Sequence, residues 1–207
     1  MKKSIFPIIV LLVVILFAAL FYYQYQKSKT DVVSPIPEKV ITPATAGTAP
    51  AIEVITADLL NDKIIDLSGK GLTLVSPDLL KNTTLVELNL SDNSLSTLPS
   101  QIQSWINLEE LRLGNNKLTA LPAEIRFFTK LTILDASQNS LTGIPAEIGQ
   151  LSNLKELDLS DNNITEFPNE ILNLTGLERL DIRGNPVTDE HLKLLEDGLT
   201  DTEILFE

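Results

Sequence analysis

Cysteine is absent from the 207-residue sequence, and histidine and tryptophan occur once each. The chain therefore forms no disulfide bonds and has neither a thiolate nucleophile nor a cysteine-based metal site. It also lacks a serine, histidine and aspartate set, a glycine-rich phosphate loop and a histidine–carboxylate metal spacing. We expect no catalytic residues, no cofactor and no metal site, and we predict that the protein is not an enzyme.

Basic residues are scarce outside the N-terminal segment. The first 30 residues carry Lys2, Lys3, Lys27 and Lys29 and no acid, so the net charge of −12 leaves −16 for residues 31–207. A domain with this charge is repelled by phosphate backbones and anionic lipid surfaces. The composition thus argues against nucleic acid as a partner.

An uncharged apolar run extends from Ile5 to Tyr23. At about 1.5 Å per residue, such a helix spans about 30 Å of hydrocarbon. A cleaved signal peptide is the alternative, but small residues at both positions of an A-x-A-like site are missing near its end. We predict a single N-terminal transmembrane anchor over residues 1–23 rather than a cleaved signal.

The flanking lysines favour a cytoplasmic N-terminus, because positive charge is enriched on that side of membranes. This predicts a single-pass plasma-membrane protein whose remaining chain lies outside, and the lack of cysteine fits a bacterial cell envelope. Residues 24–52 are rich in Pro, Thr and Ala without an apolar period. We expect them to form a disordered stalk.

A pattern of the form LxxLxLxxNxL recurs every 23 residues. Its five copies begin at Leu85, Leu108, Leu131, Leu154 and Leu177. The pattern resembles the leucine-rich-repeat family, and the repeat length resembles its Ras-suppressor and bacterial types. The resemblance implies an α/β solenoid: a horseshoe with a concave parallel β-sheet and short helical or 3-10 convex segments, preceded here by the transmembrane helix.

The spacing of the apolar residues has its own physical interpretation. Alternation at Leu88 and Leu90 predicts a short strand with one buried face, and a 23-residue return places the next strand alongside it, about 4.8 Å away. The family resemblance implies that one asparagine per repeat forms a structural ladder that satisfies main-chain groups of neighbouring coils. These asparagines are Asn93, Asn116, Asn139, Asn162 and Asn185.

The second half of each repeat reads LPxxIxxL or a close variant, which predicts a short helix or 3-10 turn with proline near its start. We interpret Trp105 and Phe128 in this half as core residues. The repeat domain is predicted to cover residues 53–207, with an N-terminal cap over 53–84, repeats over 85–187 and a C-terminal cap over 188–207. Thr188 to Leu195 is expected to form a capping helix closed by Gly198, with a last strand at Ile204 and Phe206 and His191 as a solvated surface residue.

Side chains that flank the strand leucines are expected to project from the concave face. The candidate ligand-binding residues there are Glu87, Asn89, Glu110, Arg112, Ile133, Asp135, Glu156, Asp158, Arg179, Asp181 and Arg183. A solvated polar face is the simpler interpretation of most of them, with Arg112 beside Asp135 and Arg179 beside Glu156 as weak lateral pairs.

Three features of this face are harder to explain as solvation alone. Asp135, Asp158 and Asp181 form a column of like charges on adjacent strands, an unfavourable arrangement unless a cation or basic ligand neutralises it. Ile133 is an exposed apolar residue in the same region, and Gly114 is expected to leave a gap beside it.

The sequence therefore predicts a membrane-tethered binding module for a protein or peptide partner with basic side chains, held through the concave sheet face. The alternative is a structural envelope spacer or self-assembling scaffold without a specific ligand. Repeat surfaces host many unrelated ligands on one scaffold, so the residues do not identify the partner.

Overall fold

The computed structural model describes residues 61–207. The predicted transmembrane anchor, the predicted stalk and the start of the predicted N-terminal cap lie outside the described residues. Within residues 61–207, no helix has the length and apolar character needed to cross a membrane.

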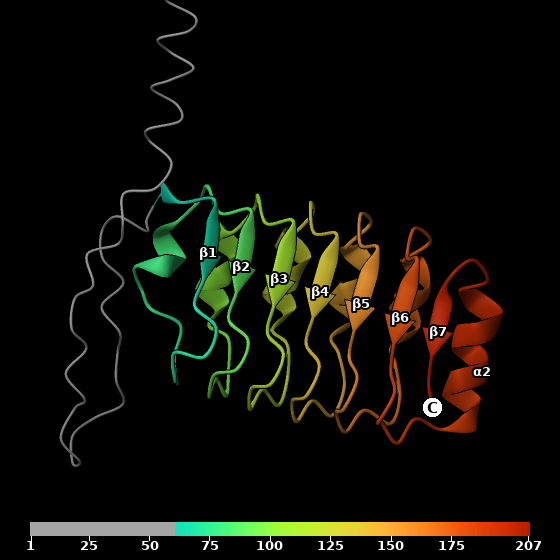
Figure 1. The fold of residues 1–207 in the computed structure, drawn as a ribbon. Helices are drawn as coiled ribbons and strands as arrows, with labels where there is room; N and C mark the ends of the chain where they lie inside the picture. The colour runs from blue at the N-terminus through green and yellow to red at the C-terminus, as the bar shows by residue number, and fades with distance from the viewer. Residues whose placement is uncertain (1–60) are drawn as a thin grey trace, which may run out of the picture. The chain divides into compact units, whose positions relative to one another are not determined.

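The described residues form one continuous parallel sheet on one side and a row of 3-10 turns on the other (Figure 1). The strands are β1 (Ile64–Asp66), β2 (Glu87–Asn89), β3 (Glu110–Arg112), β4 (Ile133–Asp135), β5 (Glu156–Asp158), β6 (Arg179–Asp181) and β7 (Glu203–Leu205). The turns are η2 (Leu79–Lys81), η3 (Ser100–Ser104), η4 (Ala123–Phe127), η5 (Ala146–Gln150) and η6 (Asn169–Asn173), and the helix α2 (Asp189–Gly198) follows β6.

Strand order follows sequence order, and the register confirms the 23-residue period. Leu88 pairs with Leu111, Leu111 with Leu134, and this step continues to Leu180. The central residue of β1, Ile65, joins the same row. Since each strand has only three residues, its middle side chain enters the core while the two flanking side chains point outward.

Each coil turns after its strand through a residue in the left-handed region. Asp92, Asn115, Gln138 and Asp161 have φ between 50° and 57°, and Gly184 occupies the corresponding place after β6. The ladder asparagine follows directly. This turn directs the asparagine side chain inward, toward main-chain groups of its own coil and of the preceding one.

The ladder asparagines make the same set of hydrogen bonds in successive coils. The side-chain oxygen of Asn116 accepts the N–H of Leu95 at 3.0 Å, and its amide donates to the oxygens of Leu90 and Leu113 at 3.0 and 2.9 Å. Corresponding bonds surround Asn93, Asn139, Asn162 and Asn185. They satisfy main-chain groups that the buried turn would otherwise leave without partners.

The outer segments are 3-10 turns that begin directly after a proline, as the LP motif predicts. The oxygen of Pro99 accepts the N–H of Ile102 at 3.2 Å, an i to i+3 bond typical of this geometry. Trp105 and Phe128 are fully buried and stacked, with ring centroids 6.3 Å apart, which confirms their core role. The indole N–H of Trp105 donates to the oxygen of Leu79.

The C-terminal end differs in detail from the prediction. Helix α2 begins after Thr188, whose hydroxyl accepts the N–H of His191, and it continues through Gly198 rather than ending before it. The last strand, β7, is centred on Ile204, which packs against the core, whereas Phe206 lies beyond the strand and is exposed.

The prediction of a solvated His191 was wrong, because the first turn of α2 packs against the preceding repeat. The histidine side chain is only 24% exposed. Its Nδ1 accepts the N–H of Phe167 at 3.3 Å, and its Nε2 lies 3.6 Å from a carboxylate oxygen of Glu166.

Candidate functional site

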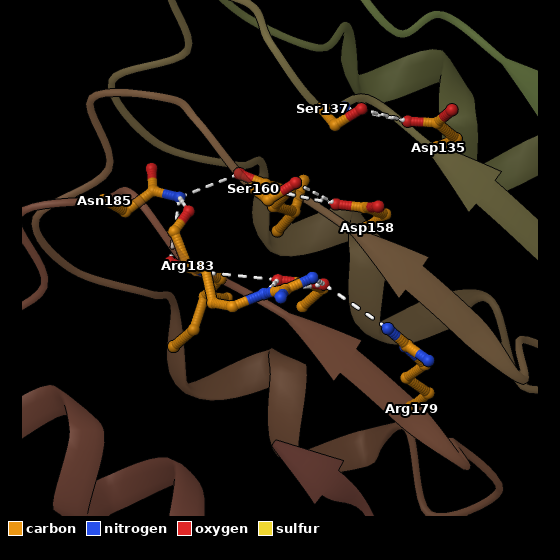
Figure 2. Close-up of polar contacts among 10 residues, drawn as sticks. Asp135, Ser137, Asp158, Ser160, Arg179, Arg183 and Asn185 are labelled. Atoms are coloured by element: carbon orange, nitrogen blue, oxygen red, sulfur yellow. Dashed lines mark hydrogen bonds and ion pairs between the residues drawn. The ribbon is translucent and has the colours of Figure 1, made fainter. Parts of the chain in front are cut away.

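The outward side chains of the strands form one surface, which we call the sheet face. It has two main rows that run across the strands, one through the first residue of each strand and one through the third. The register places ten of the eleven candidate binding residues in these rows. Arg183 follows β6 by two residues and lies beside Asp181 (Figure 2).

The aspartate column lies in register on three adjacent strands, as the period predicts. Asp135 pairs with Asp158, and Asp158 with Asp181. The column is also the surface on which the local geometry differs most from strand to strand.

Two of these aspartates close the turn that follows their strand. The Oδ1 of Asp135 accepts the N–H and the hydroxyl of Ser137 at 3.0 and 2.7 Å. Asp158 accepts the same pair of bonds from Ser160 at 2.9 and 2.6 Å (Figure 2). Because Oδ1 takes both bonds, Oδ2 of each aspartate has no hydrogen bond within residues 61–207.

The same turn bond occurs on the first strands, with Asp66 and Asn89 as acceptors. The acceptor at this position therefore has a structural role, which the sequence analysis missed. The signal that could have revealed it is the recurrence of Asp or Asn two residues before serine, a spacing typical of side chains that bond their own backbone.

Asp181 is the buried member of the column, with a side chain only 2% exposed. Arg183 binds it through Nε, 2.9 and 3.2 Å from the two carboxylate oxygens, and through Nη2, and Arg179 lies 3.6 Å away (Figure 2). Burial acts to raise the pKa of Asp181, but the hydrogen bonds from Arg183 and the charges of both arginines outweigh it and hold this pKa below its ordinary value.

The predicted lateral ion pairs are not formed. Arg112 binds Glu110 of its own strand, although Asp135 is its neighbour across the sheet. The Asp135 carboxylate is turned toward Ser137, which leaves Glu110 as the better acceptor. Arg179 likewise pairs with Asp181 rather than with its lateral neighbour Glu156, since attraction to a buried carboxylate is screened less.

The expected gap at Gly114 is also absent. A Cβ atom on Gly114 would lie 3.0 Å from Oδ2 of Asp135 and 3.1 Å from the hydroxyl of Ser137. The side chains of the next strand therefore fill the space that the glycine leaves. Ile133 is half-buried rather than fully exposed.

Charge on the sheet face is concentrated on two strands. Asp135 on β4 and Glu156 and Asp158 on β5 carry three negative charges without a basic residue among the outward positions of either strand. We call these three residues the acidic window. Arg112 on β3 and Arg179 on β6 bound it on either side.

A second hollow lies away from the sheet face, where the loops before η5 and η6 meet the first turn of α2. It has a volume of about 510 Å³ and is lined by Thr142, Glu166, Phe167, Glu170 and His191, among others. Within residues 61–207, no group of three or more histidine and acidic side chains is placed to hold a metal ion.

Comparison with known proteins identifies the repeat. A family model described as "Leucine-rich repeat region" matches residues 73–199. No curated protein matches the sequence.

Three solved structures are similar to this chain. A leucine-rich-repeat protein of Leptospira interrogans is 30% identical with a TM-score of 0.54, over 64% of this chain and 40% of that one. An internalin of Listeria monocytogenes is 26% identical with a TM-score of 0.58, over 64% and 38%. The plant peptide hormone receptor RGFR1, solved in complex with RGF2, is 31% identical with a TM-score of 0.55, over 65% and 22%. The chain thus spans two fifths or less of each of these proteins.

Proposed function

Because the chain belongs to the leucine-rich-repeat family, we propose that it is a binding module that captures a protein or peptide ligand on its sheet face. The 23-residue period and the 3-10 outer segments support assignment to the Ras-suppressor and bacterial type of repeat. A similar repeat surface occurs in a plant receptor solved with a peptide hormone, which supports a peptide or protein as the ligand class.

The observation that carries this proposal is the acidic window. Three carboxylates lie on two adjacent strands, and none of them has an ion pair within residues 61–207. Like charges on neighbouring strands are unfavourable, and a basic side chain would neutralise them. The Oδ2 atoms of Asp135 and Asp158 are the acceptors that such a side chain would reach, with the half-buried Ile133 as an apolar contact.

Asp181 takes no part in ligand capture under this proposal, because Arg183 and Arg179 already neutralise it and its side chain is buried. The column of three aspartates thus reduces to two ligand-facing carboxylates together with Glu156. Two strands about 4.8 Å apart offer room for one basic side chain.

A peptide-display selection on the full chain in nonionic detergent tests this proposal. We expect the selected peptides to be enriched in lysine or arginine, and we expect the Asp135→Asn/Asp158→Asn variant to lose that enrichment. Asp66→Asn is the matched control, because Asp66 makes the same turn bond outside the window. Selection of the same peptides by the double variant would refute the window as the binding site.

The alternative function, a spacer or self-assembling scaffold, makes a different prediction. A self-assembling chain would show a mass that rises with concentration in light scattering and would select no peptide. A binding module would keep a constant mass and retain its selected peptides.

Tethering to a membrane is the second part of the proposal, and it rests on the sequence of residues 5–23 alone. We propose a single-pass protein with a cytoplasmic N-terminus and the repeat domain outside, as in a bacterial cell envelope, and no enzymatic activity. Fractionation of source cells tests the anchor: the intact chain should stay with membranes, and its repeats should be accessible to added protease. Release of a soluble form that lacks the first 23 residues would contradict it.

A further inference from the structure

Strand β6 differs from its neighbours in carrying more basic than acidic side chains on the sheet face. Arg179 and Arg183 surround the single carboxylate of Asp181, which gives a local charge of +1 beside the −3 of the acidic window. On β3, by contrast, one arginine is balanced by one carboxylate, since Arg112 binds Glu110.

The turn after β6 does not require this excess. On β4 and β5 the equivalent aspartates are satisfied by Ser137 and Ser160, which donate a main-chain N–H and a hydroxyl. A serine at position 183 would close the turn in the same way. Arg183 therefore supplies something besides the turn bond.

The guanidinium groups are held in place but not fully used. Arg183 binds Asp181 through Nε and Nη2 and keeps its Nη1 group without a hydrogen bond within residues 61–207, while its side chain is 51% exposed. Arg179 is 47% exposed and has an ion pair at 3.6 Å but no hydrogen bond within the same residues. The buried carboxylate thus orients two guanidinium groups that retain free donors.

We propose that Arg179 and Arg183 form a carboxylate clamp for an acidic side chain of the ligand whose basic side chain lies in the acidic window. This inference rests on the proposed function, because the window positions the ligand. Guanidinium groups suit carboxylates because their planar donors can form paired, charge-assisted hydrogen bonds. The clamp lies on an open surface, so a side chain from the middle of an extended segment reaches it.

The surroundings of the clamp select ligands that carry both charges. Glu156 and Glu203 are lateral neighbours of Arg179, and Asp158 and Asp161 contribute to the field at Arg183. A purely acidic ligand is repelled by these groups and by the window. A purely basic ligand is repelled by the arginines on both sides of the window.

The geometry also sets the spacing within the ligand. Strands lie about 4.8 Å apart, so the clamp on β6 is about 5 to 10 Å from the two aspartates of the window. An extended peptide that crosses the strands advances about 3.3 Å per residue. The acidic residue of the ligand is therefore expected two or three positions from the basic one.

Titration of the full chain in nonionic detergent with three acetylated and amidated peptides tests this inference. The first is Gly-Ser-Arg-Gly-Gly-Glu-Ser, the second has Gln in place of Glu, and the third has Gln in place of Arg. Binding is followed by nuclear magnetic resonance through the arginine Nε–H signals. We expect the first peptide to bind about threefold to tenfold more tightly than the second, a coupling typical of groups in direct contact.

The variant Arg183→Ser keeps the turn bond found on β4 and β5, and it should remove this preference, as should Arg179→Gln. Arg112→Gln is the matched control and should retain it. Equal binding of the first two peptides would overturn the clamp while leaving the window intact. Failure of all three peptides to bind would overturn the clamp and count against the proposed function itself.

Discussion

Gly149 and Glu170 make the closest backbone approach between two outer turns. A Cβ atom on Gly149, in η5, would lie only 2.1 Å from the main-chain oxygen of Glu170, in η6. Because that neighbour is backbone, it cannot move aside as the end of a flexible side chain can. This glycine therefore allows adjacent coils to stack on the side opposite the sheet.

The variant Gly149→Ala should be destabilised by about 1 to 3 kcal/mol or more, the usual cost of forcing an extra group into a packed site. Urea unfolding followed by circular dichroism would measure it. Gly143→Ala is the control, since a Cβ atom there meets no atom within 4 Å, and its stability should change by less than about 0.5 kcal/mol. Equal stability of the two variants would contradict the observed stacking.

Gln138 occupies the left-handed position before a ladder asparagine, with φ of 50°. This conformation costs an ordinary L-residue about 1 to 2 kcal/mol and asparagine less. We expect Gln138→Asn, which copies Asn115 of the preceding coil, to raise stability by about 0.5 to 1 kcal/mol. Gly184→Ala, at the equivalent position, should have the opposite effect, and the two thermal melting temperatures would check both signs.

The pH dependence of stability should depend in part on Asp181. Its pKa in the folded chain is lowered, so it contributes stability that is present above the unfolded pKa of about 3.9 and is lost as pH falls through the lower folded value. Asp181→Asn should therefore be less stable than the parent at pH 7 and approach it below about pH 4. Thermal melting across pH 2 to 7 would measure this, and parallel curves for the two proteins would exclude the role.

Leu134 tests the register of the central repeat, since its side chain is 1% exposed between Leu111 and Leu157. Leu134→Ala should cost about 2 to 5 kcal/mol, because it removes buried methyl groups and leaves a cavity. Glu147→Ala should cost less than about 1 kcal/mol, since its contact with Arg126 is a 3.9 Å ion pair between partly exposed side chains. Chemical denaturation of both variants provides the comparison.

The repeat period by itself determined the strand register, the buried leucines, the burial of Trp105 and the 3-10 turns after each proline. These features follow from sequence because each coil contacts only its neighbours, so a fixed period places equivalent residues side by side. The rows of the sheet face, including Asp135 beside Asp158, follow for the same reason.

Only the tertiary structure decided which polar side chains bind one another on that face. Arg112 could reach Glu110 or Asp135, and the choice depends on Ser137, which already donates to Asp135. The space over Gly114 is likewise filled by the next strand. Side-chain competition of this kind has no period, because it depends on the rotamer and burial of each neighbour in three dimensions. The burial of Asp181 between two arginines, and with it the charge reversal at β6, was decided in the same way.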